Sequence, residues 1–179
     1  LLLDDGSEIT ANTIISTAGY TETLRLCDTN DKQETENNVG KLTFTETITL
    51  FKEQPKDLGW NDTIIFFNDG DEFKYEAPQS ELVDPRSGVI CLPNNYTYPD
   101  DKNLEYGILR VTALAHSQRW FTLEEAAYQK EKQAWYDILQ KTALNILPNL
   151  KESQTEFASR TVAKDMFTPR TVHKFTGHI

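Results

Sequence analysis

Two charged residues lie on strand faces that otherwise carry apolar side chains, and they mark where the sequence could place chemistry. Glu46 lies in a strand expected over residues 41–51, in phase with apolar residues on the face that should be buried: Leu42, Phe44, Ile48 and Leu50. Arg110 is likewise a charged residue on an otherwise apolar strand face, in a strand expected over residues 106–115. Because an unpaired charge is costly to bury, each must find a partner, water or a cavity. We therefore hypothesise that Glu46 and Arg110 meet across a sheet or line one pocket; the alternative is that each face is open to solvent.

His116 closes the strand that carries Arg110 and lies in phase with it. With Trp120 nearby, it could edge a site for an apolar ligand. A capping or partly buried histidine is the more common role, and no metal-ligand set surrounds it. The sequence therefore gives His116 and Trp120 as candidates for a substrate pocket and predicts no metal site.

A basic stretch near the end of the chain contrasts with the acidic remainder. It contains Arg170, His173, Lys174 and His178. Such a cluster could face a cofactor phosphate or another domain. The alternative is an edge strand with its charges turned outward.

No cofactor-binding signature is present in the sequence. A dinucleotide fold needs glycines that let the backbone approach the pyrophosphate at the start of a helix. The chain has 8 glycines, none in a GxGxxG arrangement. We therefore do not expect the chain to bind a flavin tightly by itself.

Composition places the chain among ordinary soluble globular proteins. It has 179 residues, 38% hydrophobic and 26% charged, with a formal net charge of -10. An acidic chain repels phosphate backbones, so we expect no nucleic-acid partner. No apolar run approaches the length of a membrane span, and we expect no signal peptide. Cys27 and Cys91 lie outside any CxxC motif and read as buried free thiols, although one disulfide stays open.

The first part of the chain predicts a hairpin and a short helix. Asp4-Asp5-Gly6 is a tight-turn sequence, and a second strand is expected through Ile9 and Ile15, ending at Ala18-Gly19. A helix is expected over residues 21–26. Residues 28–38 are almost wholly polar and predict a loop or linker.

The remainder predicts strands followed by one long helix. Short apolar runs over residues 63–67 and 88–92 are expected to form further strands of the buried kind. Thr122 and Glu125 suggest a capping box, and Pro148 ends the helix. Its apolar stripe is expected to contain Leu123, Ala127, Ala134, Ile138 and Ile146, widened by Ala126, Trp135, Leu139 and Leu147. Residues 155–175 favour strands and are interrupted by Pro169, so one or two extended segments are expected there. The fold class is α+β, a mainly antiparallel or mixed sheet backed by helices.

Several passages resemble the phytoene desaturase and carotenoid isomerase family of flavoproteins. Residues 5–11 and 14–19, which read DGSEITA and IISTAG, resemble a passage at which that family's chain leaves the flavin domain. Residues 167–169 (FTP) and 175–178 (FTGH) resemble the return passage. Between them, residues 87–95 and 110–115 resemble a subgroup described as phytoene dehydrogenase-like. These motifs keep the family's order and spacing over nearly the whole chain.

The resemblance implies the substrate domain of a glutathione-reductase-like flavoprotein. It divides the chain into a hairpin edge of the FAD domain (1–19), the substrate domain (20–165) and a return segment (166–179). It implies a full-length enzyme that binds FAD and transfers a hydride from an apolar, carotenoid-like substrate to the flavin. The cofactor-side candidates are then Ala18, Gly19, Arg170 and His173.

The resemblance also shapes what we expect of the whole protein. Residue 1 is leucine, and both ends look cut, so we expect an inactive internal fragment whose FAD-binding segments lie upstream and downstream. Its partners would be the apolar substrate and its own FAD domain. A cytoplasmic location, with peripheral contact to a membrane that holds the substrate, is expected. Two alternatives stay open: an amine oxidase of the same superfamily, which needs an aromatic cage for the amine, and a non-catalytic interaction domain.

Overall fold

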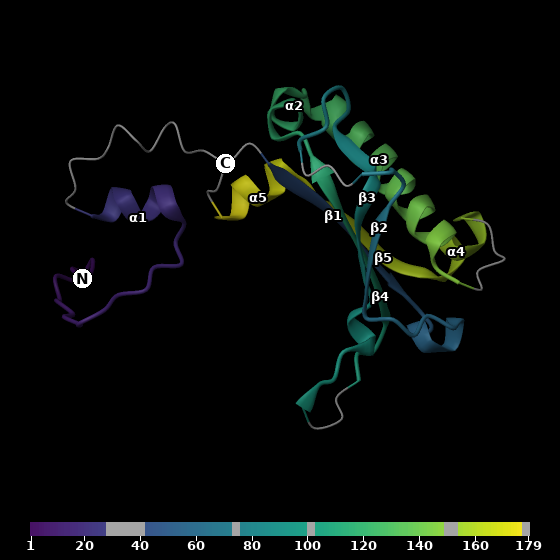
Figure 1. Cartoon of the computed structure of the whole chain (residues 1–179), viewed down its shortest axis with the longest axis horizontal. Helices are drawn as coiled ribbons and strands as arrows, with labels where there is room; N and C mark the ends of the chain where they lie inside the picture. The colour runs from purple at the N-terminus through teal and green to yellow at the C-terminus, as the bar shows by residue number, and fades with distance from the viewer. Residues whose placement is uncertain (28–41, 73–75, 100–102, 149–153, 177–179) are drawn as a thin grey trace. The chain divides into compact units, whose positions relative to one another are not determined.

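The chain folds into two separate units in a computed structural model that describes residues 1–27, 42–72, 76–99, 103–148 and 154–176 (Figure 1). The first unit lies within residues 1–39 and the second within residues 40–177. Each unit is described by itself. The expected polar loop over residues 28–38 lies outside the described residues.

The first unit contains a tight turn and a short helix. Gly6 has a φ of 81°, a conformation that favours glycine, and its N–H donates to Leu3 O at 2.9 Å. Leu2 and Glu8 form an isolated bridge, which confirms the hairpin turn. The expected second strand does not continue to residue 15, where the backbone is irregular and exposed. Helix α1 (Tyr20–Leu26) confirms the short helix.

The second unit is built on a five-stranded antiparallel sheet with the order β2-β3-β4-β1-β5. Its strands are β1 (Thr43–Phe51), β2 (Ile64–Asn68), β3 (Val83–Cys91), β4 (Gly107–Ala115) and β5 (Thr161–Phe167). Its helices are α2 (Ser117–Thr122), α3 (Glu125–Ile146), α4 (Gln154–Arg160) and α5 (Pro169–Thr176), with the 3₁₀ turns η2 (Pro55–Leu58) and η3 (Pro93–Asn95). This arrangement confirms the α+β class and an antiparallel sheet.

The buried face of β1 is the opposite of the one that hydropathy predicts. Thr45, Thr47 and Thr49 are at most 1% exposed, whereas Phe44 is 42% exposed. The threonines pair with small or aliphatic residues of β4 that are also buried: Leu109, Val111 and Ala113. The expectation that the face of Glu46 is the buried one was therefore wrong. Threonine favours strands and fills little volume, so this face leaves room for large side chains from a helix.

Helix α3 supplies those large side chains and lies along the threonine face of the sheet (Figure 1). Its buried residues are Tyr128, Trp135, Tyr136, Leu139, Gln140, Ala143 and Leu144. Of the expected stripe, Ala127, Ala134 and Ile138 are exposed, so this part was wrong, whereas Trp135, Leu139 and Leu147 are buried as expected. The true stripe lies one position further along the chain than Ala127, Ala134 and Ile138, a rotation of about 100°. Aromatic residues with a polar tip fill the space over the threonines, and a count of aliphatic residues alone misses them.

A buried hydrogen-bond network joins α3 to the threonine face. Thr49 Oγ1 lies 2.6 Å from the Tyr136 hydroxyl oxygen and 3.0 Å from Gln140 Oε1. Because the single hydroxyl proton of Thr49 goes to Gln140, the Tyr136 hydroxyl donates to Thr49. Burial raises the pKa of Tyr136, so its phenol keeps this proton at neutral pH. The network therefore fixes which face of β1 lies beneath the helix.

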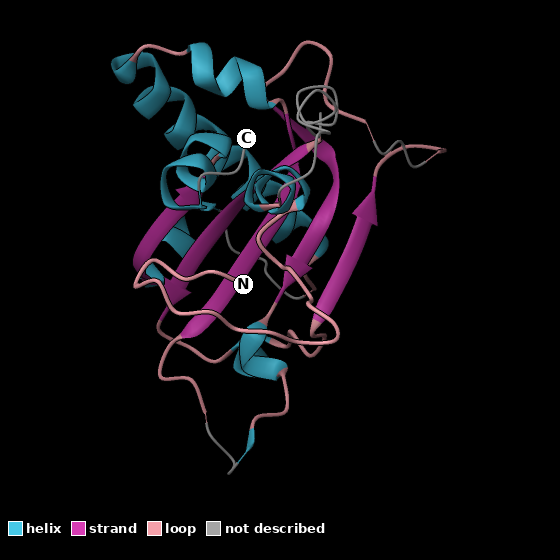
Figure 2. Cartoon of the chain, turned by 90° about the vertical axis from the view of Figure 1, so that its left-hand side faces the viewer, coloured by secondary structure: helices cyan, strands magenta, loops and turns pink. Residues whose placement is uncertain are grey.

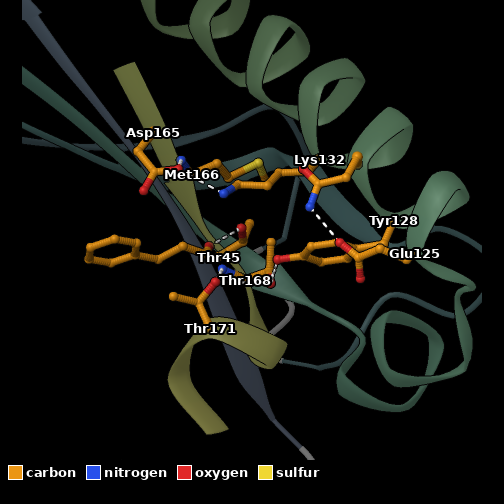
Figure 3. A network of polar contacts seen from close by, with 10 residues as sticks. Thr45, Glu125, Tyr128, Lys132, Asp165, Met166, Thr168 and Thr171 are labelled. Atoms are coloured by element: carbon orange, nitrogen blue, oxygen red, sulfur yellow. Dashed lines mark hydrogen bonds and ion pairs between the residues drawn. The ribbon is translucent and has the colours of Figure 1, made fainter. Parts of the chain in front are cut away.

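A second set of polar contacts attaches the start of α3 to the end of the sheet (Figure 3). The Tyr128 hydroxyl lies 3.0 Å from Thr168 Oγ1, and Lys132 Nζ lies 2.7 Å from Asp165 Oδ1. On the next strand, Thr45 Oγ1 donates to Phe167 O at 2.6 Å. These contacts hold β5 and α5 against α3 and β1.

The helix starts and the final segment depart from expectation. Helix α3 begins after Glu124 without a side-chain cap, and Thr122 Oγ1 donates to Arg119 O instead, so the expected capping box was wrong. The extended segment expected over residues 155–175 is only partly right. Strand β5 occupies its middle, but α4 precedes it and α5 follows. Pro169 opens α5, because proline suits the first turn of a helix, where its missing N–H costs nothing.

We predict that Tyr136→Phe destabilises the second unit by about 1–2 kcal/mol, because Thr49 Oγ1 loses its buried donor. Urea unfolding followed by tryptophan fluorescence measures this effect, since Trp60, Trp120 and Trp135 are all buried in this unit. The matched control is Tyr106→Phe, which removes an exposed hydroxyl and should change the free energy of unfolding by less than about 0.5 kcal/mol. Equal effects of the two substitutions would contradict the role given to the network.

Candidate functional site

The face of the sheet opposite the threonine face of β1 carries exposed apolar side chains. Figure 2 shows the five strands side by side. The register places Phe66, Val89, Thr112, Glu46 and Phe167 in one row across this face. Phe66 is 79% exposed and Phe167 is 42% exposed. We call this surface the open face. Exposed apolar surface of this kind commonly marks a binding site.

A groove lies on the open face and has a volume of about 490 Å³. That volume falls within the range of small-molecule sites. Its lining comes from four strands and is mainly apolar: Phe44, Phe66, Phe67, Asn68, Ser87, Gly88, Val89, Thr112, Ala113 and Leu114. The groove can therefore take an apolar molecule.

Glu46 and Arg110 form a two-pronged ion pair at the border of this groove. Arg110 Nε donates to Glu46 Oε1 at 2.5 Å, and Arg110 Nη2 donates to Glu46 Oε2 at 2.9 Å. Thr112, a groove residue, donates to Glu46 Oε2 at 3.3 Å. The hypothesis that Glu46 and Arg110 meet is confirmed. They meet on the open face and not in a closed core, with side chains 19% and 42% exposed respectively.

The ion pair has neutral polar neighbours. Cys91 lies opposite Arg110 on β3, and Tyr96 follows η3. Burial raises the pKa of Tyr96, and the nearby Cys91 thiol raises it further. The hydrogen bond to Glu46 raises the pKa of Arg110. This cluster therefore holds one ion pair and a protonated phenol beside an apolar groove.

The other pocket candidates are not brought to the ion pair. His116 begins α2, and its backbone N–H donates to Leu82 O at 3.0 Å. Trp120 is fully buried, and its indole N–H donates to Leu82 O at 3.1 Å. Trp120 packs edge-on against Tyr128 of α3, with ring centroids 5.8 Å apart. Trp120 is therefore a residue of the closed core and does not line the open face.

The basic candidates near the end of the chain have partners within the second unit. Arg170 donates to Leu123 O at 3.2 Å and to Glu125 Oε2 at 3.0 Å, and its guanidinium lies 4.1 Å from the centre of the Tyr128 ring. His173 contacts the Phe121 ring edge-on. These contacts hold α5 against α2 and α3. A cofactor-side role for Arg170 and His173 stays a prediction.

The remaining cofactor-side candidates belong to the first unit. Ala18 is exposed, and Gly19 precedes α1 with a φ of 106°. A side chain at Gly19 would be strained in that conformation, so glycine is required there for the helix start. Their predicted relation to a flavin is a property of a longer protein and is not tested by this geometry.

Sequence reasoning missed most of the groove and the neighbours of Arg110. Phe66 and Val89 were expected in buried strands, and Cys91 was expected to be a buried thiol. Cys91 is half-buried and Cys27 is exposed, and both are free. The available signal was the alternation of threonine with apolar residues in β1, which does not by itself tell which face is closed.

Comparison of the chain with protein-family models, curated proteins and solved structures finds no match in any of the three. The flavoprotein family therefore stays a prediction from the resemblance. Among the described residues, no group of histidine, cysteine and acidic side chains is arranged to hold a metal ion. No helix in the described ranges is long and apolar enough to cross a membrane.

We predict a coupling energy of about 1 kcal/mol between Glu46 and Arg110, because the pair is two-pronged but only partly shielded from water. A double-mutant cycle with Glu46→Gln and Arg110→Met, read by urea unfolding, measures it. A control cycle on the more exposed Glu125–Arg170 pair should give a smaller value. The prediction fails if the Glu46–Arg110 coupling is zero within error or does not decrease with added salt.

Proposed function

We propose that this chain is the substrate domain of an FAD-dependent oxidoreductase related to the phytoene desaturases. In this proposal the open face binds an elongated apolar, carotenoid-like substrate and holds it toward the flavin domain. The single observation that carries the proposal is the inverted sheet, which buries threonines under α3 and leaves aromatic and aliphatic side chains exposed. A free-standing domain gains more by burying those apolar side chains, so their exposure supports a surface that meets a ligand or another domain.

The flavin would be held by parts of the protein outside this chain. The sequence has no glycine fingerprint, and none of the described residues forms the strand, glycine-rich turn and helix that cradle a pyrophosphate. The residues of this chain therefore do not fit an FAD site, and we assign none of them a step of the redox reaction. Their contribution is to bind the substrate and to exclude water from it.

The open face also suits a protein partner, which makes a non-catalytic interaction domain the second candidate. Apolar exposed patches are typical of such surfaces. Self-association or capture of another chain would then depend on the same side chains. The amine-oxidase alternative needs an aromatic cage around a cation, and the exposed phenylalanines Phe44, Phe66 and Phe167 of the open face would have to supply it.

Binding of a neutral polyene tests the groove directly. We expect the chain to bind methyl cis-parinarate, a polyene ester whose fluorescence increases in apolar surroundings. Phe66→Gln should weaken binding by at least about fivefold, because the groove loses an aromatic contact. Phe175→Gln is the matched control, since Phe175 lies on α5 and is 78% exposed, close to the 79% of Phe66. Equal affinities for the two variants would contradict a binding role of the groove.

The coding sequence upstream of this chain tests whether the protein is a flavoenzyme. We expect the coding sequence upstream of Leu1 to contain a strand, a GxGxxG turn and a helix, with an acidic residue about 20 positions further on. The full-length protein should then purify as a yellow flavoprotein. An upstream sequence without that fingerprint, together with a colourless full-length protein, would refute the flavoprotein assignment and leave the interaction domain.

A further inference from the structure

One edge of the Arg110 guanidinium is left for a ligand. Arginine has five N–H donors, and the Glu46 carboxylate takes the edge formed by Nε and Nη2. Among the described residues, none accepts a hydrogen bond from Nη1 of Arg110. With its side chain 42% exposed, Arg110 offers its second edge, formed by Nη1 and Nη2, to an incoming acceptor.

The oxygens of Glu46 are by contrast already engaged. Oε1 accepts from Arg110, and Oε2 accepts from both Arg110 and Thr112. The Glu46 side chain is also the less exposed of the pair, at 19%. A cationic head group would therefore meet a carboxylate that is turned toward its partners, beside an exposed guanidinium that repels it. The charge arrangement favours an anion over an amine.

The apolar groove adjoins this guanidinium. Thr112 lines the groove, belongs to the same strand face as Arg110, and donates to Glu46. Tyr96 also lies close enough to Arg110 for the two to affect each other's pKa, next to Cys91, which is opposite Arg110 in the sheet. The Tyr96 hydroxyl is hydrogen-bonded to the Cys91 side chain, so the donors for a head group come from Arg110. An apolar body and an acceptor head group thus have adjoining sites on the open face.

We infer that the ligand of the open face is an amphipathic carboxylate: an elongated apolar chain that lies in the groove and a carboxylate head that pairs with the free edge of Arg110. This inference rests on the proposed function, because it uses the same groove and names the chemical class of its substrate. It separates the chain from an enzyme that acts on pure hydrocarbons and from one that acts on amines.

The test compares one polyene with and without its charge. Cis-parinaric acid carries a carboxylate, and its methyl ester is neutral but otherwise the same molecule. We expect the whole 179-residue chain to bind the acid about tenfold more tightly than the ester at neutral pH, because a charge-assisted hydrogen bond is roughly twice as strong as a neutral one. Added salt should reduce the difference in affinity between the acid and the ester, because it screens the charge interaction with Arg110.

Two single variants separate recognition from a merely structural role of the ion pair. Arg110→Met should remove the preference for the acid and leave the affinity for the ester nearly unchanged. Glu46→Gln keeps the guanidinium and removes the neighbouring negative charge, so it should raise the affinity for the acid or leave it unchanged. If the ion pair had only a structural role, both variants would bind the acid and the ester more weakly than the unaltered chain. If Arg110→Met unfolds, the double variant Glu46→Gln/Arg110→Met leaves no unpaired charge and should again lack the preference.

The outcomes distinguish this inference from the proposed function. Equal affinity for the ester and the acid would refute the inferred carboxylate, whereas the groove would still stand as a binding site for an apolar molecule. Failure of both probes to bind would overturn both, and a concentration-dependent dimer in sedimentation would then assign the open face to a second copy of the chain. If the amine analogue, parinaryl amine, bound more tightly than the acid, the preference for a carboxylate would be refuted and the amine-oxidase alternative would be favoured.

Discussion

The packing of α3 on the threonine side of β1 is the constraint on which the remaining structure depends. Small threonine side chains leave space that Tyr136 fills, and the Thr49–Tyr136–Gln140 hydrogen bonds pair the hydroxyls of Thr49 and Tyr136 with each other and with Gln140 Oε1. Thr47 Oγ1 and Gln140 Nε2 are buried in the same layer without a hydrogen-bond partner among the described residues. Because strand side chains alternate, closing this face, which also buries Phe51, turns Phe44, Ile48 and Leu50 toward the other side. The open face and its ion pair follow from that one choice.

The ion pair has a different meaning on an open face than in a core. In a core, Glu46 and Arg110 would only neutralise each other, and their desolvation would offset much of their attraction. At the border of a groove, the same geometry holds the guanidinium in a fixed orientation and leaves one of its edges accessible. An arginine positioned by a neighbouring carboxylate is preorganised for an acceptor, which lowers the entropy lost on binding.

Much of the fold could be predicted from the sequence, and the candidate site only in part. Period-two alternation located β1 and β4, and the meeting of Glu46 with Arg110 followed from their shared misfit. The choice of face could not be predicted, because threonine and aliphatic residues both favour strands and alternation is symmetrical between the two sides. The buried stripe of α3 was predicted only in part, at Trp135, Leu139 and Leu147, for a related reason: Tyr128 and Tyr136 are amphipathic and are buried by contacts that hydropathy does not count. Helix α5 was missed because Pro169 was read as a break in a strand.

Single-cysteine labelling along β1 tests the inverted sheet most directly. In a chain carrying Cys27→Ala and Cys91→Ala, one cysteine is introduced at a time as Phe44→Cys, Thr45→Cys, Thr47→Cys or Ile48→Cys, and its reaction with a maleimide is timed under native conditions. The account predicts that the cysteines at positions 44 and 48 react at least about tenfold faster than those at 45 and 47, which are protected until the unit opens. Protection of positions 44 and 48 with rapid labelling of 45 and 47 would contradict it, because the apolar face would then be the closed one.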